Sequence, residues 1–253
     1  CSFRRAPELE GNDVVDVSVD VNGRLLALAI PPSGDAFVSA STDSGATWSA
    51  LGMPLPPKFQ PLTVDAAKSD TTHVYASGVL GAVSPKGALV ASIDGGATWS
   101  TTLIDGSTNT SAPFIAAIDP VDAERVFVRL HGAPGELLVT EDGGTTFQGI
   151  FTAVGFLRAF ALSPDGTYAL FGGDTDGVRR LDTSTYETSP LSSLGAKCLS
   201  IRGADVYACA DEGTDGFSAG LSHDGGATFE PLLHQQCIEG PVDCPMGSPV
   251  DAA

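Results

Sequence analysis

One short turn motif recurs along the chain and constrains the fold more than any other feature. Residues 41–48, 92–99, 140–147 and 222–229 share the order Ser or Thr, any residue, Asp, Gly or Ser, Gly, Ala or Thr, Thr, and finally Trp or Phe. The aspartates of the four copies lie 51, 48 and 82 residues apart. The last interval fits two repeats, and a degenerate copy at residues 182–186 falls near its middle. Self-similarity at this period is typical of repeat folds and β-propellers.

Each copy has the chemistry of a β-hairpin tip. An aspartate carboxylate can accept backbone N–H groups across a tight turn, and a glycine can adopt the positive φ that such a turn requires. The threonine and the aromatic residue that follow favour the start of a strand. The positions that carry this pattern are Asp43, Gly45, Trp48, Asp94, Gly96, Trp99, Asp142, Gly144, Phe147, Asp224, Gly226 and Phe229.

The residues before each turn complete a unit of four strands. In the third repeat, strands are expected at 114–118, 125–129, 136–140 and 146–150, separated by short polar turns. The same order fits about 14–51, 62–103, 114–152, 156–191 and 198–233. The sequence therefore predicts an all-β, single-domain β-propeller over residues 1–253, with five antiparallel four-stranded blades. Residues 234–253 are either a tail or the start of a further blade, so the total blade number stays open.

The motif resembles the Asp box, also called the bacterial neuraminidase repeat. That repeat occurs in sialidases, sortilin-type receptors, xyloglucan-cleaving endoglucanases and photosystem-assembly propellers. The resemblance implies a structural hairpin at the outer part of each blade, away from any active site. It implies this bracing role for Asp43, Asp94, Asp142 and Asp224.

The sequence does not identify a catalytic site. Sialidases require an arginine triad and a Tyr–Glu pair, and the spacing of the arginines here does not single out three. An endoglucanase requires two carboxylates across a cleft, and 22 aspartates offer many such pairs. We therefore expect a non-enzymatic binding or scaffold protein, with a sialidase- or endoglucanase-like glycoside hydrolase as the alternative.

The net charge of the chain limits the classes of partner that it can bind. It carries 31 acidic and 13 basic residues, a formal net charge of −18, and such a surface repels nucleic acid. No apolar run is long enough to span a membrane. We expect a monomer that binds a protein or a carbohydrate.

The five cysteines help to predict the cellular compartment of the protein. Cys198 and Cys209 flank a turn symmetrically, which predicts a cross-strand disulfide. Cys237 and Cys244 form a second candidate pair, with buried thiols as the alternative for both pairs. Disulfides would place the protein outside the bacterial cytoplasm, secreted, periplasmic or on the outer surface. Cys1 is either a lipid-modified first residue or a partner for a cysteine outside this sequence.

Two acidic loops, in the fourth and fifth repeats, offer hard oxygen ligands of the kind that calcium prefers. They contain Asp174, Asp176, Asp211, Glu212 and Asp215. Neither loop continues into an EF-hand pattern. Solvated acidic turns with no cofactor are the first interpretation, and a calcium site is the second.

Overall fold

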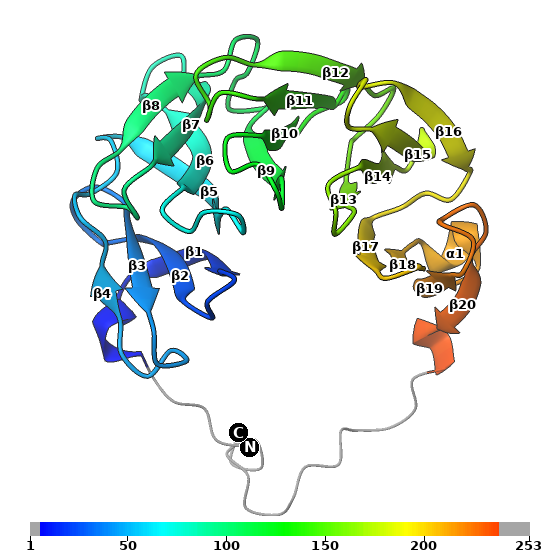
Figure 1. Cartoon of the computed structure of the whole chain (residues 1–253), viewed down its shortest axis with the longest axis horizontal. Helices are drawn as coiled ribbons and strands as arrows, with labels where there is room; N and C mark the ends of the chain where they lie inside the picture. The colour runs from blue at the N-terminus through cyan, green and yellow to red at the C-terminus, as the bar shows by residue number, and fades with distance from the viewer. Residues whose placement is uncertain (1–5, 238–253) are drawn as a thin grey trace, which may run out of the picture.

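The computed structural model describes residues 6–237 and forms five four-stranded antiparallel sheets that follow one another around a ring (Figure 1). The all-β class and the five predicted blades are confirmed. In every sheet the strands are neighbours in chain order, as expected for hairpins joined by short turns.

The blades have the following bounds. The first contains β1 (Asp13–Val19), β2 (Leu25–Ile30), β3 (Phe37–Ser41) and β4 (Ser49–Ala50). The second contains β5 (Phe59–Ala66), β6 (Val74–Leu80), β7 (Lys86–Ser92) and β8 (Ser100–Leu103). The third contains β9 (Pro113–Ile118), β10 (Val126–Leu130), β11 (Glu136–Thr140) and β12 (Gln148–Thr152). The fourth contains β13 (Ala159–Leu162), β14 (Tyr168–Gly173), β15 (Gly177–Asp182) and β16 (Thr188–Ser192). The fifth contains β17 (Cys198–Arg202), β18 (Asp205–Cys209), β19 (Ala219–Ser222) and β20 (Glu230–Leu233). Short helical turns are η1 (Pro7–Leu9), α1 (Glu212–Asp215) and η2 (Gln235–Cys237).

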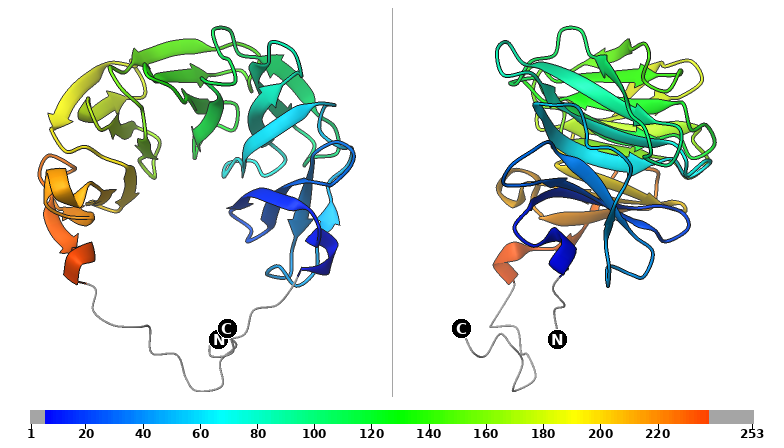
Figure 2. Two further views of the ribbon diagram at one scale, coloured as in Figure 1. Left: turned by 180° about the vertical axis from the view of Figure 1, so that it is seen from behind. Right: turned by 90° about the vertical axis from the view of Figure 1, so that its left-hand side faces the viewer.

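The first strand of each blade lies nearest the centre of the ring and the fourth lies at its rim (Figures 1 and 2). Because successive strands run in opposite directions, the turns between strands one and two and between strands three and four emerge on one face. We call it the turn face, and it carries the repeated Asp-Gly motifs. The loops between strands two and three and the connections between blades emerge on the opposite face, which we call the link face.

The core of the molecule lies between neighbouring blades. Four apolar clusters fill the four boundaries between consecutive blades. At the first boundary, Leu28 and Val38 of the first blade belong to the same buried cluster as Val64 and Val90 of the second. The second, third and fourth blades thus each bury one face against the blade before and the other against the blade after.

The ring of described residues is an incomplete circle, and the first and fifth blades stand apart (Figure 1). Val17 pairs with Ala27 as Val64 pairs with Ala76 in the next blade, so the two valines are equivalent. Val64 is 2% exposed, whereas Val17 is 54% exposed. The outward face of the first blade therefore presents apolar side chains that the other blades bury.

The predicted disulfide is confirmed. Cys198 lies directly opposite Cys209 in the β17–β18 pair, and the two sulfurs are bonded with Cα atoms 4.8 Å apart. Cys237 is exposed at the end of the described chain. Cys1 and Cys244 lie outside the described residues, so the second pairing and the lipid anchor stay predictions.

Candidate functional site

In the repeated turns of the turn face, the aspartate is a hydrogen-bond acceptor that closes the hairpin. In the second blade, Asp94 accepts from the Ser92 hydroxyl at 2.7 Å, from the Thr98 amide at 2.8 Å and from the Thr98 hydroxyl at 2.7 Å. The other three copies repeat this set of bonds around Asp43, Asp142 and Asp224.

These bonds favour the ionised carboxylate. Donation from Thr98 and Ser92 lowers the pKa of Asp94 to about 2, and equivalent donors lower the pKa of Asp43 and Asp142 to about 2. The pKa of Asp224 is lowered by the same arrangement. These carboxylates are engaged within their own turns, which leaves little capacity to bind a ligand.

In the second, third and fifth blades, the second glycine of the motif brings the turn against the preceding blade. Gly144 has φ +92°, and a Cβ built on it would lie 2.7 Å from Leu89 Cδ2 of the second blade. Gly96 similarly leaves no room for a side chain beside Leu51 of the first blade. The indole of Trp99 donates to the Met53 carbonyl at 3.1 Å, which adds a bond to the same connection.

The degenerate copy in the fourth blade also forms a turn. Asp182 accepts from the Ser184 amide at 2.8 Å and from the Thr185 amide at 3.1 Å. Tyr186, four residues after Asp182, has φ +58°, whereas the positive-φ residues of the other copies come one and two residues after the aspartate. The turn is retained although the motif is not.

A second turn brace was missed by sequence reasoning. Asp119 is fully buried after β9, where it accepts from the Arg125 Nε at 2.9 Å and from the Val121 amide at 2.8 Å. Asp20 and Arg24 form the same pair in the first blade at 2.8 Å. An aspartate that ends an apolar strand, followed four to six residues later by arginine, was the available signal.

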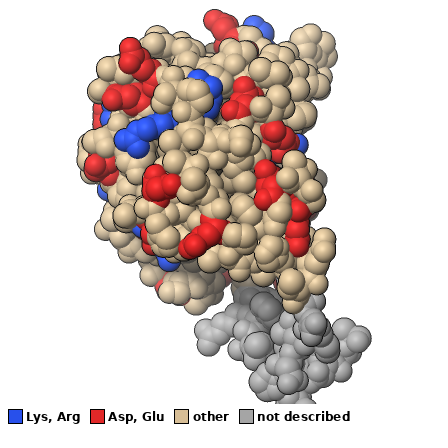
Figure 3. Space-filling view, turned by 90° about the vertical axis from the view of Figure 1, so that its right-hand side faces the viewer, with Lys and Arg blue, Asp and Glu red and all other residues tan. Residues whose placement is uncertain are grey.

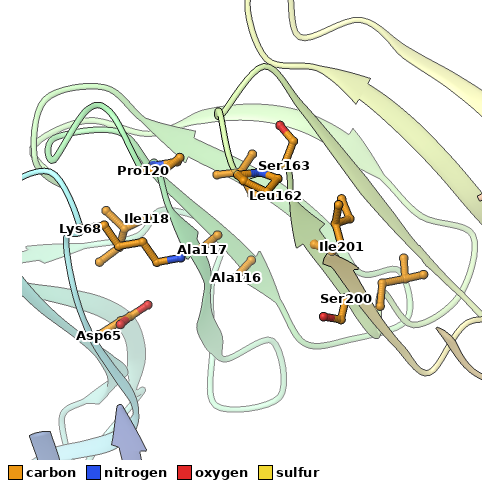
Figure 4. Close-up of a pocket in the computed structure, with 13 residues that line it drawn as sticks. Asp65, Lys68, Ala116, Ala117, Ile118, Pro120, Leu162, Ser163, Ser200 and Ile201 are labelled. Atoms are coloured by element: carbon orange, nitrogen blue, oxygen red, sulfur yellow. The ribbon is translucent and has the colours of Figure 1, made fainter. Parts of the chain in front are cut away.

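A cavity of about 320 Å³ lies on the inner side of the ring toward the turn face, bordered by the second to fifth blades (Figure 4). Asp65 and Lys68 are its charged side chains, and most of the rest are apolar or proline. Burial raises the pKa of Asp65, although the Ser18 hydroxyl donates to it at 2.6 Å.

A pocket of about 380 Å³ lies on the link face between the fourth and fifth blades. It contains two ion pairs, Arg158 with Asp174 and Lys197 with Asp211, each at 2.7 Å. Asp215 accepts from the Gly195 amide at 3.2 Å at the same pocket. Both signs of charge therefore meet here. Figure 3 shows acidic groups spread over one side of the molecule, with basic groups among them.

The structure brings only some of the predicted acidic-loop residues together. Asp174, Asp211 and Asp215 line the link-face pocket, but Asp176 accepts instead from the Val154 amide at 3.0 Å. Glu212 accepts from the Ser218 hydroxyl at 2.9 Å. Among residues 6–237, no group of three or more His, Cys, Asp or Glu side chains is placed to hold a metal ion. The calcium interpretation stays a prediction, and this geometry weakens it.

No helix within residues 6–237 is long and apolar enough to cross a membrane. The Cys198–Cys209 disulfide is compatible with an extracellular or periplasmic protein, because such bonds persist in oxidising compartments.

Known structures resemble this chain in fold. No family model and no curated protein matches the sequence. A structure of YCF48 bound to D1 peptide aligns with a TM-score of 0.58 at 16% identity, covering 89% of this chain and 70% of that one. YCF48 from Cyanidioschyzon merolae aligns with a TM-score of 0.55 at 13% identity, covering 87% and 70%.

The GH74 xyloglucanase from Xanthomonas campestris aligns with a TM-score of 0.60 at 15% identity, covering 89% of this chain and 38% of that one. At these identities the likeness concerns the fold alone. The protein is a β-propeller, and its fold neighbours include both a peptide-bound protein and a glycoside hydrolase.

Proposed function

We propose that this chain is a non-enzymatic binding propeller that holds a peptide segment of another protein on its link face. The observation that carries the proposal is the link-face pocket, where Arg158, Lys197 and three carboxylates surround about 380 Å³. A peptide offers both charge signs and backbone donors and acceptors, which match such a lining.

The charge and the fold agree with this proposal. A net charge of −18 disfavours nucleic acid as the partner. Among the fold neighbours, YCF48 has a structure bound to a peptide. Because loops on a rigid scaffold commonly carry binding sites, the link-face loops are the expected place for one.

We also propose a structural role for the repeated turns of the turn face and a cellular location for the protein. The four repeated turns act as structural Asp boxes, and their internal hydrogen bonds support that role. The protein works outside the bacterial cytoplasm, which the Cys198–Cys209 disulfide supports.

The test selects peptides from a random displayed library on the purified protein and measures the affinity of the selected sequences. Lys197→Gln should weaken binding by about tenfold, the usual effect of losing one charged contact. Arg202→Gln is the matched control, since Arg202 is exposed at the other end of β17, next to the turn face. Asp94→Ala should keep binding wherever it folds. Failure to select any peptide, or equal effects of the Lys197 and Arg202 variants, would contradict the proposal.

A glycoside hydrolase is the second candidate, and one observation favours it. Asp65 lines the inner cavity with a raised pKa, as a general acid requires. Its neighbour Asp16 already accepts from the Val64 amide at 2.9 Å and the Val17 amide at 3.0 Å. Hydrolysis of a polysaccharide panel that Asp65→Asn abolishes would establish this function in place of the first.

A further inference from the structure

Five side chains form a row on the link face where the third blade meets the fourth. Arg129 lies over the ring of Phe114, 4.8 Å from its centroid, and that ring lies 6.0 Å from the ring of His131. His131 lies 5.2 Å from Phe156, whose ring carries Arg158 at 5.1 Å. We call these residues the cation–aromatic row. It adjoins the link-face pocket because Arg158 belongs to both.

Among the described residues, Arg129 and Arg179 both lie over an aromatic ring without a carboxylate partner, but the Nε of Arg179 is buried. Arg24, Arg125 and Arg158 each pair with an aspartate. Within the described part of the chain, Arg129 donates from Nη1 to the Leu157 carbonyl at 3.1 Å and has no acidic partner.

The remaining donors of Arg129 reach solvent. Within residues 6–237, Nε and Nη2 make no hydrogen bond, yet neither is among the buried polar atoms that lack a partner. The Phe114 ring lies over one face of the guanidinium and Nη1 is engaged by the Leu157 carbonyl, so the donors left for a ligand are those of the Nε–Nη2 edge. That edge has the spacing that receives both oxygens of a carboxylate.

The surroundings disfavour a lone cation at this position. The guanidinium is half-buried, and burial together with the charge of Arg158 lowers the pKa of Arg129. Two nearby cations without a full set of counterions repel each other, and an anion that lies between them removes that cost. The exposed rings of His131 and Phe156 offer an apolar contact beside it.

We propose that Arg129 binds a ligand carboxylate through its Nε–Nη2 edge, while His131 and Phe156 contact an apolar group next to that carboxylate. The ligand class is a peptide in which a carboxylate lies beside an aromatic or aliphatic side chain. The carboxylate comes from an acidic side chain or from a chain terminus. The peptide nature of the ligand rests on the proposed function, whereas the carboxylate contact does not.

The experiment titrates four small compounds into the purified protein and follows binding by NMR. N-acetyl-phenylalanine carries a terminal carboxylate, and N-acetyl-Phe-Glu-amide carries a side-chain carboxylate. N-acetyl-phenylalanine amide and N-acetyl-Phe-Gln-amide are the neutral matches. We expect at least one carboxylate compound to bind about tenfold more tightly than its neutral match, and the pair that shows the difference identifies the source.

Substitutions locate the contact. Arg129→Gln should reduce the carboxylate compound to the affinity of its neutral match, and Arg129→Lys should restore only part of the difference because lysine lacks the planar fork. Arg180→Gln is the matched control, because Arg180 also stacks on a ring, that of Tyr168 at 3.9 Å, but lies outside the row. Circular dichroism confirms that each variant is folded.

Three results would overturn the inference. They are equal binding of charged and neutral compounds to the unsubstituted protein, equal effects of the Arg129 and Arg180 substitutions, and displacement of the carboxylate by equimolar inorganic phosphate. The first needs no variant, so it decides the matter even if Arg129→Gln fails to fold. If peptide selection fails but the carboxylate titration succeeds, the proposed function is wrong and the Arg129 site stands.

Discussion

At the scale of single residues, one carboxylate organises each repeated turn. Asp94 is exposed, yet its oxygens accept three hydrogen bonds from Ser92 and Thr98. Such bonds require the ionised form, because a protonated carboxyl loses acceptor capacity. The turns therefore couple folding to pH.

The protein should lose stability in acid as the carboxylates of the repeated turns become protonated. The pKa values of Asp43, Asp94 and Asp142 are lowered from the ordinary 3.8 to about 2 in the folded protein. Their contribution to stability is therefore complete above pH 3.8 and is lost as the pH falls toward about 2. Thermal melts from pH 6 to pH 2 should show this loss, and Asp94→Asn should make it shallower. An equally steep loss in Asp94→Asn would contradict the role of that carboxylate.

At the scale of the hairpin and blade, glycine decides how closely a turn approaches the neighbouring blade. Gly143 and Gly144 both have positive φ, +66° and +92°. A Cβ on Gly144 would meet Leu89 Cδ2 at 2.7 Å, whereas one on Gly143 would meet only the Tyr75 hydroxyl at 3.5 Å. The two positions thus separate backbone strain from steric contact.

We expect Gly143→Ala to cost about 1 kcal/mol of unfolding free energy through its left-handed backbone. Gly144→Ala should cost roughly 1–2 kcal/mol more, because the methyl group must also displace Leu89. Urea unfolding of both variants measures the difference. Equal costs would mean that the turn does not press on the second blade.

The fifth blade depends on a covalent bond between its first two strands. Replacing both Cys198 and Cys209 with serine should lower the unfolding free energy by about 2–4 kcal/mol, because the bond restricts the unfolded chain. Denaturation of this variant beside the oxidised protein checks the value, and peptide mapping without reduction checks the pairing. Stability unchanged by the substitution would show that the blade is held by other contacts.

At the scale of the whole molecule, apolar side chains are buried at the boundaries between blades and not in a single central core. Equivalent positions in different blades therefore contribute differently according to what lies against them. Val64→Ala should cost about 1–3 kcal/mol, since Val64 is 2% exposed. Val17→Ala should cost less than about 0.5 kcal/mol, since Val17 is 54% exposed. Equal costs in urea unfolding would reveal that a further element covers the first blade in solution.

A calcium site would join two blades, because the two acidic loops belong to the fourth and fifth blades. If these loops bind calcium, millimolar calcium should raise the melting temperature by a few degrees, and Asp176→Asn combined with Asp215→Asn should reduce that shift. Existing bonds from Arg158, Lys197 and backbone amides compete with the ion. A melting temperature unchanged by calcium would identify these loops as solvated turns.

The sequence alone determined the class of fold, the five visible blades and the register of the β17–β18 hairpin. These properties depend on local information: turn chemistry at Asp94, alternation along 125–129, and the symmetric placement of Cys198 and Cys209 about one turn. A hairpin pairs residues a short distance apart, so its register can be predicted from spacing.

Only the tertiary structure decided which charged groups share a site. Arg129 and Arg158 lie 29 residues apart in sequence and meet because a link between blades returns the chain to the same face. Asp176 lies two residues from Asp174, which lines the link-face pocket, yet Asp176 accepts from the Val154 amide and does not join that pocket. Side-chain direction and the packing of one blade on the next set these contacts, and neither is visible in the spacing of residues along the chain.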